Sequence, residues 1–176
     1  MLKKIMVGLD NSQLSLAAME EAIALAKAYG AELRLVHVLT DYEPGAPQRI
    51  AYFDGYHHPA MSQSMLEAYQ KGWNKFAEDY RTWLEDKVQT VSLTGLDLSS
   101  EIRLGDPSRE LCAMAKEWQA DLIVMGSHGR SGIMEMLMGS VSNYVMHHSP
   151  CSVLISHGNS AKARSNELNA KDLISI

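Results

Sequence analysis

Short apolar segments alternate with amphipathic segments along most of the 176 residues of this chain. The apolar segments have the length of buried strands, whereas the segments between them repeat apolar residues every three or four positions, as helices do. Strands that alternate with helices favour parallel βαβ units with right-handed crossovers. We therefore predict a single α/β domain over residues 1–156, with strands at 3–9, 32–39, 101–104, 120–125 and 151–156.

Capping residues mark the ends of the predicted helices. The first helix follows Asn11 and Ser12, whose side chains can accept hydrogen bonds from its first turn, and it ends at Gly30. Asp106 and Pro107 suit the N-cap and the first turn of a later helix, and a short helix is expected at 140–148. A long helix is predicted at 62–88, where a stripe of aromatic and apolar residues should face the core: Leu66, Tyr69, Trp73, Phe76, Tyr80 and Trp83.

Three segments lack a helix or strand pattern. Residues 40–60 contain three prolines and two glycines, and a connection of this length is commonly functional or disordered. Residues 89–99 are predicted to be a polar connection. Residues 157–176 form a polar tail that we expect to be flexible.

A glycine-rich segment follows the apolar run at 122–125. It contains Gly126, Gly129 and Gly132, and glycines at the end of a strand let backbone N–H groups approach a ligand that a Cβ atom would obstruct. Gly139-Ser140 stands where the last helix begins, and a helix N-terminus offers N–H groups to an anion. The segment therefore predicts a chain folded around a phosphate group, although its spacing matches neither a P-loop nor the dinucleotide fingerprint.

Asp10 follows the first predicted strand as the glycines follow the fourth. Ligands of open parallel sheets bind beyond the carboxyl ends of the strands, where the strand order reverses. If these two strands are neighbours, Asp10 and the glycines face one crevice, which favours a nucleotide as the ligand. Asp10 could equally cap the first helix, and both roles are compatible because a sugar hydroxyl uses only one carboxylate oxygen.

Charge and composition argue against several classes of partner. A net charge of −5 without a basic cluster argues against nucleic acid, because phosphate-backbone binding needs clustered Lys and Arg. No apolar run is long enough to cross a bilayer, and the N-terminal residues are typical of a strand rather than a signal peptide. Cys112 and Cys151 lack metal-ligand spacing and fit buried thiols in a reducing compartment, so we expect a cytoplasmic protein without a membrane partner.

Together these motifs resemble the universal stress proteins, in their nucleotide-binding branch. The hallmark of that branch has two residues between a first and a second glycine, nine more before a third, and then Ser or Thr. Gly126, Gly129, Gly139 and Ser140 match it. The similarity spans nearly the whole of residues 3–156 through further matching segments, namely Val7-Gly-Leu-Asp10-Asn-Ser12, His37-Val38, Gly105-Asp-Pro107 and Ser149-Pro-Cys-Ser-Val-Leu-Ile155. The 40–60 loop and the tail are not defined by the family pattern.

The resemblance implies a doubly wound, five-stranded parallel sheet of order 3-2-1-4-5 with helices on both faces, and ATP or ADP with Mg²⁺ in the crevice. Asp10 would contact the ribose or adenine side, and Val38 would pack on adenine. Met125 and Gly126 would border the base and sugar, and the last helix would begin at the phosphates. The implied contact residues are Gly8, Leu9, Asp10, Val38, Met125, Gly126, His128, Gly129, Arg130, Gly139, Ser140, Val141 and Ser142.

Two of these residues leave alternatives open. Arg130 could donate to a phosphate or point into solvent, and His128 could be a spacer in the loop or a group that takes part in chemistry. Family members usually pair their last strands, which implies a homodimer through Cys151–Ser156 and would cover an otherwise open sheet edge. A protein partner is also expected, without a sequence feature that identifies it.

The resemblance leads to a first functional hypothesis, an ATP-binding stress-response or signalling protein in which nucleotide occupancy alters dimer shape or partner choice. The alternative is a slow ATP hydrolase, or a binder of a related adenine nucleotide such as cyclic AMP. Hydrolysis needs a group that positions water, and the glycine-rich segment carries no evident carboxylate base beyond Glu135. We therefore expect at most weak ATPase activity. The intact glycine pattern argues against a third possibility, a structural dimer without nucleotide.

Overall fold

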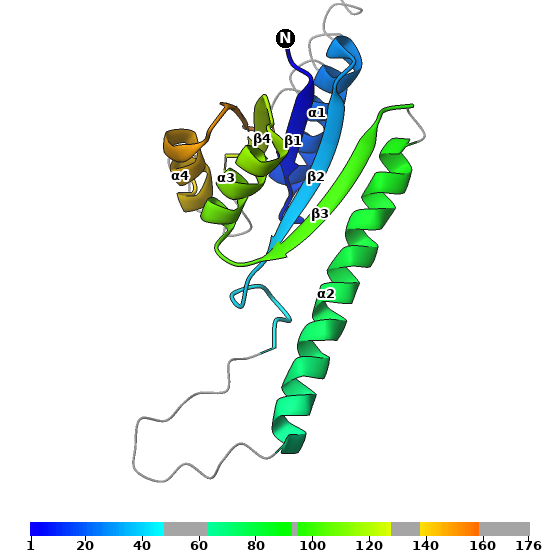
Figure 1. The fold of residues 1–176 in the computed structure, drawn as a ribbon, viewed down its shortest axis with the longest axis vertical. Coiled ribbons are helices and arrows are strands. Elements are labelled where there is room, and N and C mark those ends of the chain that lie inside the picture. The colour runs from blue at the N-terminus through cyan, green and yellow to red at the C-terminus, as the bar shows by residue number, and fades with distance from the viewer. Residues whose placement is uncertain (48–62, 93–94, 128–137, 159–176) are drawn as a thin grey trace, which may run out of the picture.

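The computed structural model describes residues 1–47, 63–92, 95–127 and 138–158 (Figure 1). All strand pairs are parallel, and the sheet has the order β3-β2-β1-β4-β5. The predicted α/β fold and strand order are therefore confirmed. The strands and helices of the described ranges are β1 Lys4–Gly8, α1 Gln13–Tyr29, β2 Glu32–Leu39, α2 Gln63–Ser92, β3 Leu98–Leu104, α3 Pro107–Trp118, β4 Leu122–Gly126, α4 Ser140–His148 and β5 Ser152–Ser156.

Helices cover both faces of the sheet. One cluster of buried residues joins α1 and α2 to the first face, with Ala22 and Leu84 packed near Val7. A second cluster joins α3 and α4 to the opposite face, with Met114 and Val145 on the side of Met6. Met6 and Val7 belong to different clusters because successive side chains of a strand point to opposite faces. The sheet is thus buried on both sides, which parallel sheets require.

Of the predicted capping residues, Ser12, Gly30 and Asp106 act as the sequence predicts. The Ser12 hydroxyl accepts a hydrogen bond from the Ser15 N–H at 3.1 Å, and α1 ends at Gly30, which has a left-handed φ of +63°. The Asp106 carboxylate accepts from the Arg109 N–H at 3.0 Å, and Pro107 is the first residue of α3. These three helix ends are therefore set by local sequence.

The largest boundary errors surround the connection between α2 and β3. α2 continues to Ser92, and β3 begins at Leu98, although a polar connection was expected over residues 89–99. Leu98 pairs with Leu33 of β2, and the polar Ser99 and Ser100 continue the same ladder. Hydrophobic alternation does not reveal this strand start, because pairing with β2 decides it.

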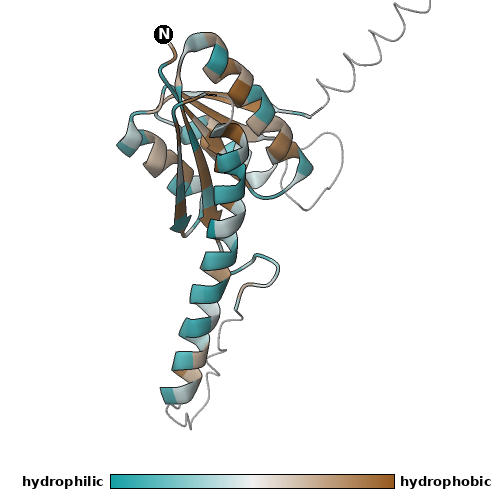
Figure 2. Ribbon diagram, turned by 90° about the vertical axis from the view of Figure 1, so that its right-hand side faces the viewer, coloured by the Kyte–Doolittle hydropathy of each residue, from teal (hydrophilic) through white to brown (hydrophobic). Residues whose placement is uncertain are grey.

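α2 extends beyond the sheet at its N-terminal end (Figures 1 and 2). Its 30 residues span about 45 Å, whereas the 8 residues of β2 span about 27 Å. Leu84 and Val91 are buried, but Leu66 is 40% exposed, so the prediction that the whole stripe faces the core is wrong for its first turns. None of the helices in the described ranges is long and apolar enough to cross a membrane.

The first residues of the predicted irregular segment pack against α2. The Ala46 N–H donates to the Glu43 carbonyl at 3.0 Å, which closes a turn. A Cβ at Gly72 would lie 3.3 Å from Pro47 Cγ, and a Cβ at Gly45 would lie 3.8 Å from Phe76 Cε2. Gly45 and Pro47 therefore lie against the helix. The rest of the 40–60 loop and the tail from residue 159 lie outside the described residues.

Candidate functional site

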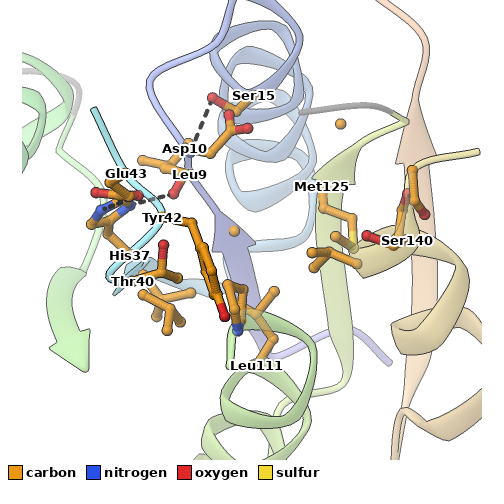
Figure 3. Close-up of a pocket in the computed structure, with 18 residues that line it drawn as sticks. Leu9, Asp10, Ser15, His37, Thr40, Tyr42, Glu43, Leu111, Met125 and Ser140 are labelled. Atoms are coloured by element: carbon orange, nitrogen blue, oxygen red, sulfur yellow. Dashed lines mark hydrogen bonds and ion pairs between the residues drawn. The ribbon is translucent and has the colours of Figure 1, made fainter. Parts of the chain in front are cut away.

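A cavity of about 430 Å³ opens at the carboxyl ends of β1, β2 and β4 (Figure 3). The connection after β1 leads to β2 on one side, and the connection after β4 leads to β5 on the other, so the strand order reverses between β1 and β4. Ligands of open α/β sheets bind at such a position. The lining residues come from the ends of these strands, the turn after β2, and the first turns of α1, α3 and α4.

Every predicted contact residue that the structure describes lines this cavity: Gly8, Leu9, Asp10, Val38, Met125, Gly126, Gly139, Ser140, Val141 and Ser142. The other three, His128, Gly129 and Arg130, lie outside the described residues. β1 and β4 are paired neighbours, so Asp10 and the described glycines do face one crevice.

The N-terminus of α4 forms one side of the cavity. Gly139 precedes the helix without a capping side chain, and the Asn143 N–H donates to the Gly139 carbonyl at 2.9 Å. The N–H groups of Ser140, Val141 and Ser142 come before that first helical bond and have no acceptor within the helix. The helix dipole adds a positive potential at the same end. This side of the cavity therefore suits an anion.

Buried hydrogen bonds tie α4 to the end of β4. The Gly139 N–H donates to the Ser127 carbonyl at 2.8 Å, and the Ser127 N–H donates to the Ser156 carbonyl of β5 at 2.9 Å. Ser142 Oγ lies 2.9 Å from the Ser127 carbonyl and 3.0 Å from the Gly139 carbonyl. A hydroxyl has one proton to donate, so the Ser142 proton serves this junction, and its backbone N–H is the donor left for a ligand.

Gly126 allows β4 to approach α1. A Cβ at Gly126 would lie 3.1 Å from the carbonyl carbon of Leu14, whereas a Cβ at Gly8 would meet Leu111 Cδ2 at 3.4 Å, an ordinary contact. The sequence analysis ascribed the glycine at 126 to a close approach of ligand. The structure adds a packing reason, because any side chain there would push against the backbone of α1.

Asp10 occupies the turn between β1 and α1. Its Oδ1 accepts from the Ser12 N–H at 3.1 Å and from the Ser12 hydroxyl at 2.6 Å, while its own N–H donates to Ser15 Oγ at 3.4 Å. Ser12 caps α1, so the capping role considered for Asp10 belongs to its neighbour. Among the described residues no group donates a hydrogen bond to Asp10 Oδ2, which leaves this oxygen for a ligand at the cavity.

A buried pair beside the cavity was missed by the sequence analysis. His37 Nδ1 lies 2.7 Å from the Leu9 carbonyl, and Nε2 lies 3.4 Å from Glu43 Oε1, with both side chains almost fully buried. Because a carbonyl only accepts, Nδ1 carries a proton. The ring also stacks on Tyr80 of α2, with centroids 4.5 Å apart. His37 therefore links the end of β1, the turn after β2 and α2.

Other lining residues were also missed, chiefly in the turn after β2 and at the start of α3. Thr40, Tyr42 and Glu43 come from the predicted irregular loop, and Pro107 and Leu111 come from α3. The sequence carried one signal for these residues. The turn after β2 follows the carboxyl end of a strand beside the point where the strand order reverses, and such turns contact ligands. The sequence could not show which of its side chains turn inward.

The two cysteines lie apart from this chemistry. Cys112 and Cys151 are free and partly buried, and burial raises the pKa of both thiols. Within the described ranges no group of three or more His, Cys, Asp or Glu side chains could hold a metal ion.

Comparison with known proteins identifies the family. The model of the universal stress protein family matches residues 1–157. The universal stress protein Sll1388 of Synechocystis sp. is 34% identical over 155 residues, which cover 86% of this chain and 96% of that protein. The solved structure of universal stress protein UspA from Lactobacillus plantarum is 27% identical with a TM-score of 0.67, and the match covers 89% of this chain and 98% of that one.

A second similar solved structure contains a bound nucleotide. It is a universal stress protein in complex with cAMP, and it is 25% identical with a TM-score of 0.53. The match covers 89% of this chain and 98% of that chain. Because the family model spans nearly all the described residues and the fold agrees, this chain belongs to the universal stress protein family.

Proposed function

We propose that the cavity binds an adenine nucleotide, ATP or ADP, and that the protein acts as a nucleotide-dependent stress-response or signalling protein. The arrangement of unlike groups in one cavity carries this proposal. Apolar Val38 lies at β2, the Asp10 carboxylate follows β1, and the N-terminus of α4 lies beyond β4. A base, a sugar and phosphates need these three environments in this order.

The base and sugar have partners at the β2 side. The base packs among Val38, Leu111 and Met125, which line the cavity and belong to the apolar cluster on that face of the sheet. Asp10 Oδ2 accepts a hydrogen bond from a ribose hydroxyl, while Oδ1 stays with Ser12. The carboxylate is thus oriented before the ligand arrives.

The phosphates have partners at the α4 side. The N–H groups of Ser140, Val141 and Ser142 and the Ser140 hydroxyl are the donors. His128, Gly129 and Arg130 complete this side in the proposal. Mg²⁺ accompanies ATP and is coordinated mainly by phosphate oxygens and water, as this ion retains much of its hydration.

The neighbour solved with cAMP supports an adenine nucleotide as the class of ligand. It also makes cyclic AMP the second candidate. Cyclic AMP has a single phosphate, so it engages fewer of the α4 N–H groups than ATP does. We therefore expect ATP to displace cyclic AMP, and the reverse order of affinity would favour the second candidate.

We expect at most weak ATP hydrolysis. Two carboxylates line the described part of the cavity, and both are engaged, Asp10 with Ser12 and Glu43 with His37. Both lie on the β1 and β2 side, away from the α4 end, so neither is placed to orient water at a terminal phosphate. A steady-state ATPase rate that persists through purification and disappears in Gly139→Val would overturn this expectation.

We also propose a cytoplasmic homodimer that pairs Cys151–Ser156 and a protein partner chosen by nucleotide occupancy. β5 is an edge of the sheet, and an exposed edge is a template for pairing with a second chain. Sedimentation velocity over a hundredfold range of concentration tests the dimer. A monomer throughout that range would contradict it.

The first test of nucleotide binding is calorimetric titration of nucleotide-stripped protein with Mg-ATP, with Gly139→Val as the control. Gly139 has φ −59° and ψ 153°, which any residue adopts, so we expect the variant to fold with a side chain added at a residue that lines the cavity. Saturable binding that weakens in the variant by about 100-fold, the equivalent of one or two charge-assisted hydrogen bonds, is expected. No binding by folded wild-type protein would reject the proposal.

A further inference from the structure

Two consecutive residues in the turn after β2, Tyr42 and Glu43, differ sharply in exposure. Glu43 is 6% exposed and lies against His37, whereas Tyr42 is 88% exposed. The Ala46 N–H bonds the Glu43 carbonyl, and Gly45 adopts a φ of +86° beside Phe76 of α2. The backbone that follows Tyr42 is therefore held against β2 and α2, although the Tyr42 ring itself is largely exposed.

The Tyr42 ring nevertheless lines the nucleotide cavity. Figure 3 shows it extending from the turn toward Leu111, on the side of the cavity opposite Ser140. Val38, Leu111 and Thr40 also line the cavity, and the charged Glu43 next to Tyr42 lies against His37. A ring so exposed at the mouth of the cavity would be buried by a planar group that stacks on it, an arrangement that aromatic faces favour.

We propose that Tyr42 is a stacking wall for the base of the bound nucleotide, and that the His37–Glu43 pair is the anchor that holds it there. This inference rests on the proposed function, which supplies a base on the β2 side. The base then lies between the ring and the apolar side chains of Val38 and Leu111. Tyr42 contributes to binding through the base alone, because its turn lies across the cavity from the α4 N–H groups.

The anchor follows from the burial of the pair. His37 donates through Nδ1 to Leu9, one residue before Asp10, and faces Glu43 through Nε2. The same imidazole thus fixes the β1 end near the sugar and the turn that carries Tyr42. Glu43 acts through the turn and does not face the base, so it is a positioning residue.

The test measures Mg-ATP affinity by calorimetry and Mg-tripolyphosphate affinity by competition with ATP. The variants are Tyr42→Ala, Tyr42→Phe and, as a matched control, Tyr29→Ala at the far end of α1, which is half exposed and does not line the cavity. Base stacking on an aromatic side chain predicts a loss of ATP affinity of about tenfold or more in Tyr42→Ala. Tyr42→Phe and Tyr29→Ala should stay within about twofold of wild type, and tripolyphosphate affinity should be equal in all four proteins.

The outcomes separate this inference from the function on which it rests. ATP binding by wild type with an unchanged affinity in Tyr42→Ala would reject the stacking wall and leave nucleotide binding standing. A parallel loss of tripolyphosphate affinity would also reject it, because the ring would then act on the phosphate side. Wild-type protein that binds neither ligand would reject both proposals.

The anchor is tested by a double-mutant cycle. Glu43→Gln keeps the shape of the side chain but removes its charge, so we expect ATP affinity to fall several-fold while tripolyphosphate affinity is unchanged. Because Glu43 acts through Tyr42, combining Glu43→Gln with Tyr42→Ala should lose little more than Tyr42→Ala alone. Fully additive losses in the two single variants would reject the anchoring role of Glu43.

Discussion

The two sides of the cavity are lined by different kinds of groups, backbone on one side and side chains on the other. The α4 side consists of backbone N–H groups that follow Gly139, supported by the junction of Ser127 and Ser142. The β2 side consists of side chains, with the His37–Glu43 pair behind Tyr42. A backbone site depends on the path of the chain, whereas a side-chain site changes with each substitution. Under the proposed function, anion binding would therefore depend on the path of the backbone, and base recognition on individual side chains.

The largest expected effect of the predictions below is at the β2 side, in His37→Leu. This change removes the imidazole that faces the buried Glu43 carboxylate, and breaking a buried pair in this way costs about 3 kcal/mol of unfolding free energy. Urea denaturation at pH 7 measures it. The double variant with Glu43→Leu should recover most of the loss. A cost below about 1 kcal/mol for His37→Leu would show that the pair does not anchor the turn.

The next effect is at the end of β4, in Gly126→Val. The new side chain would press on the Leu14 backbone, which cannot move without shifting α1, and such overpacking costs about 2 kcal/mol. Gly8→Ala is the matched control, because its Cβ meets only Leu111 at an ordinary distance, and it should stay within about 0.5 kcal/mol of wild type. Equal costs for the two glycines in urea denaturation would contradict the packing role of Gly126.

A smaller loss is expected from Ser142→Ala. It removes the buried hydroxyl that joins α4 to the Ser127 carbonyl, and a lost hydrogen bond of this kind costs about 1.5 kcal/mol. ATP affinity should fall less than in Gly139→Val, because the N–H groups at the start of α4 remain. Ser100→Ala on β3, where the side chain is exposed, is the control. A drop in ATP affinity as large as that of Gly139→Val would make the Ser142 hydroxyl a direct ligand.

The smallest effect is expected at α3, which begins at the same cavity but is capped by a side chain. Asp106→Ala should cost between about 0.5 and 1 kcal/mol, because it removes the N-cap acceptor of the Arg109 N–H. α4 begins at Gly139, which has no capping side chain. The Asp106→Ala variant would give α3 the same kind of uncapped start.

The contribution of Asp106 should depend on pH. Hydrogen bonds from the Ser108 hydroxyl and the Arg109 N–H hold the pKa of Asp106 below its ordinary value. Because the folded pKa is lowered, the stabilisation is present above the ordinary pKa, near 4, and is lost as the pH falls through the folded value. Urea denaturation of wild type and Asp106→Ala at pH 7 and at about pH 2 should show the difference shrinking in acid. A difference that grows in acid would contradict this assignment.

Much of the architecture was readable in short stretches of sequence. Ser12, Gly30 and Asp106 act on neighbours within a few residues, so their roles as helix ends follow from local chemistry. The alternation of strands and helices determined the parallel sheet. Asp10, Gly126 and Gly139 meet at one crevice because the carboxyl ends of parallel strands share an edge of the sheet. These features depend on periodicity and chain direction, which a sequence displays directly.

Other features needed the tertiary structure. β3 begins at Leu98 because β2 is there to pair with it, and the first turns of α2 stand clear of the core because the sheet is shorter than the helix. The sequence alone determined the fold, both ends of α1, the start of α3 and the glycine at the start of α4. Tertiary packing alone decided that His37 faces Glu43 and that Tyr42 lines the cavity, because a side-chain contact depends on where a loop returns.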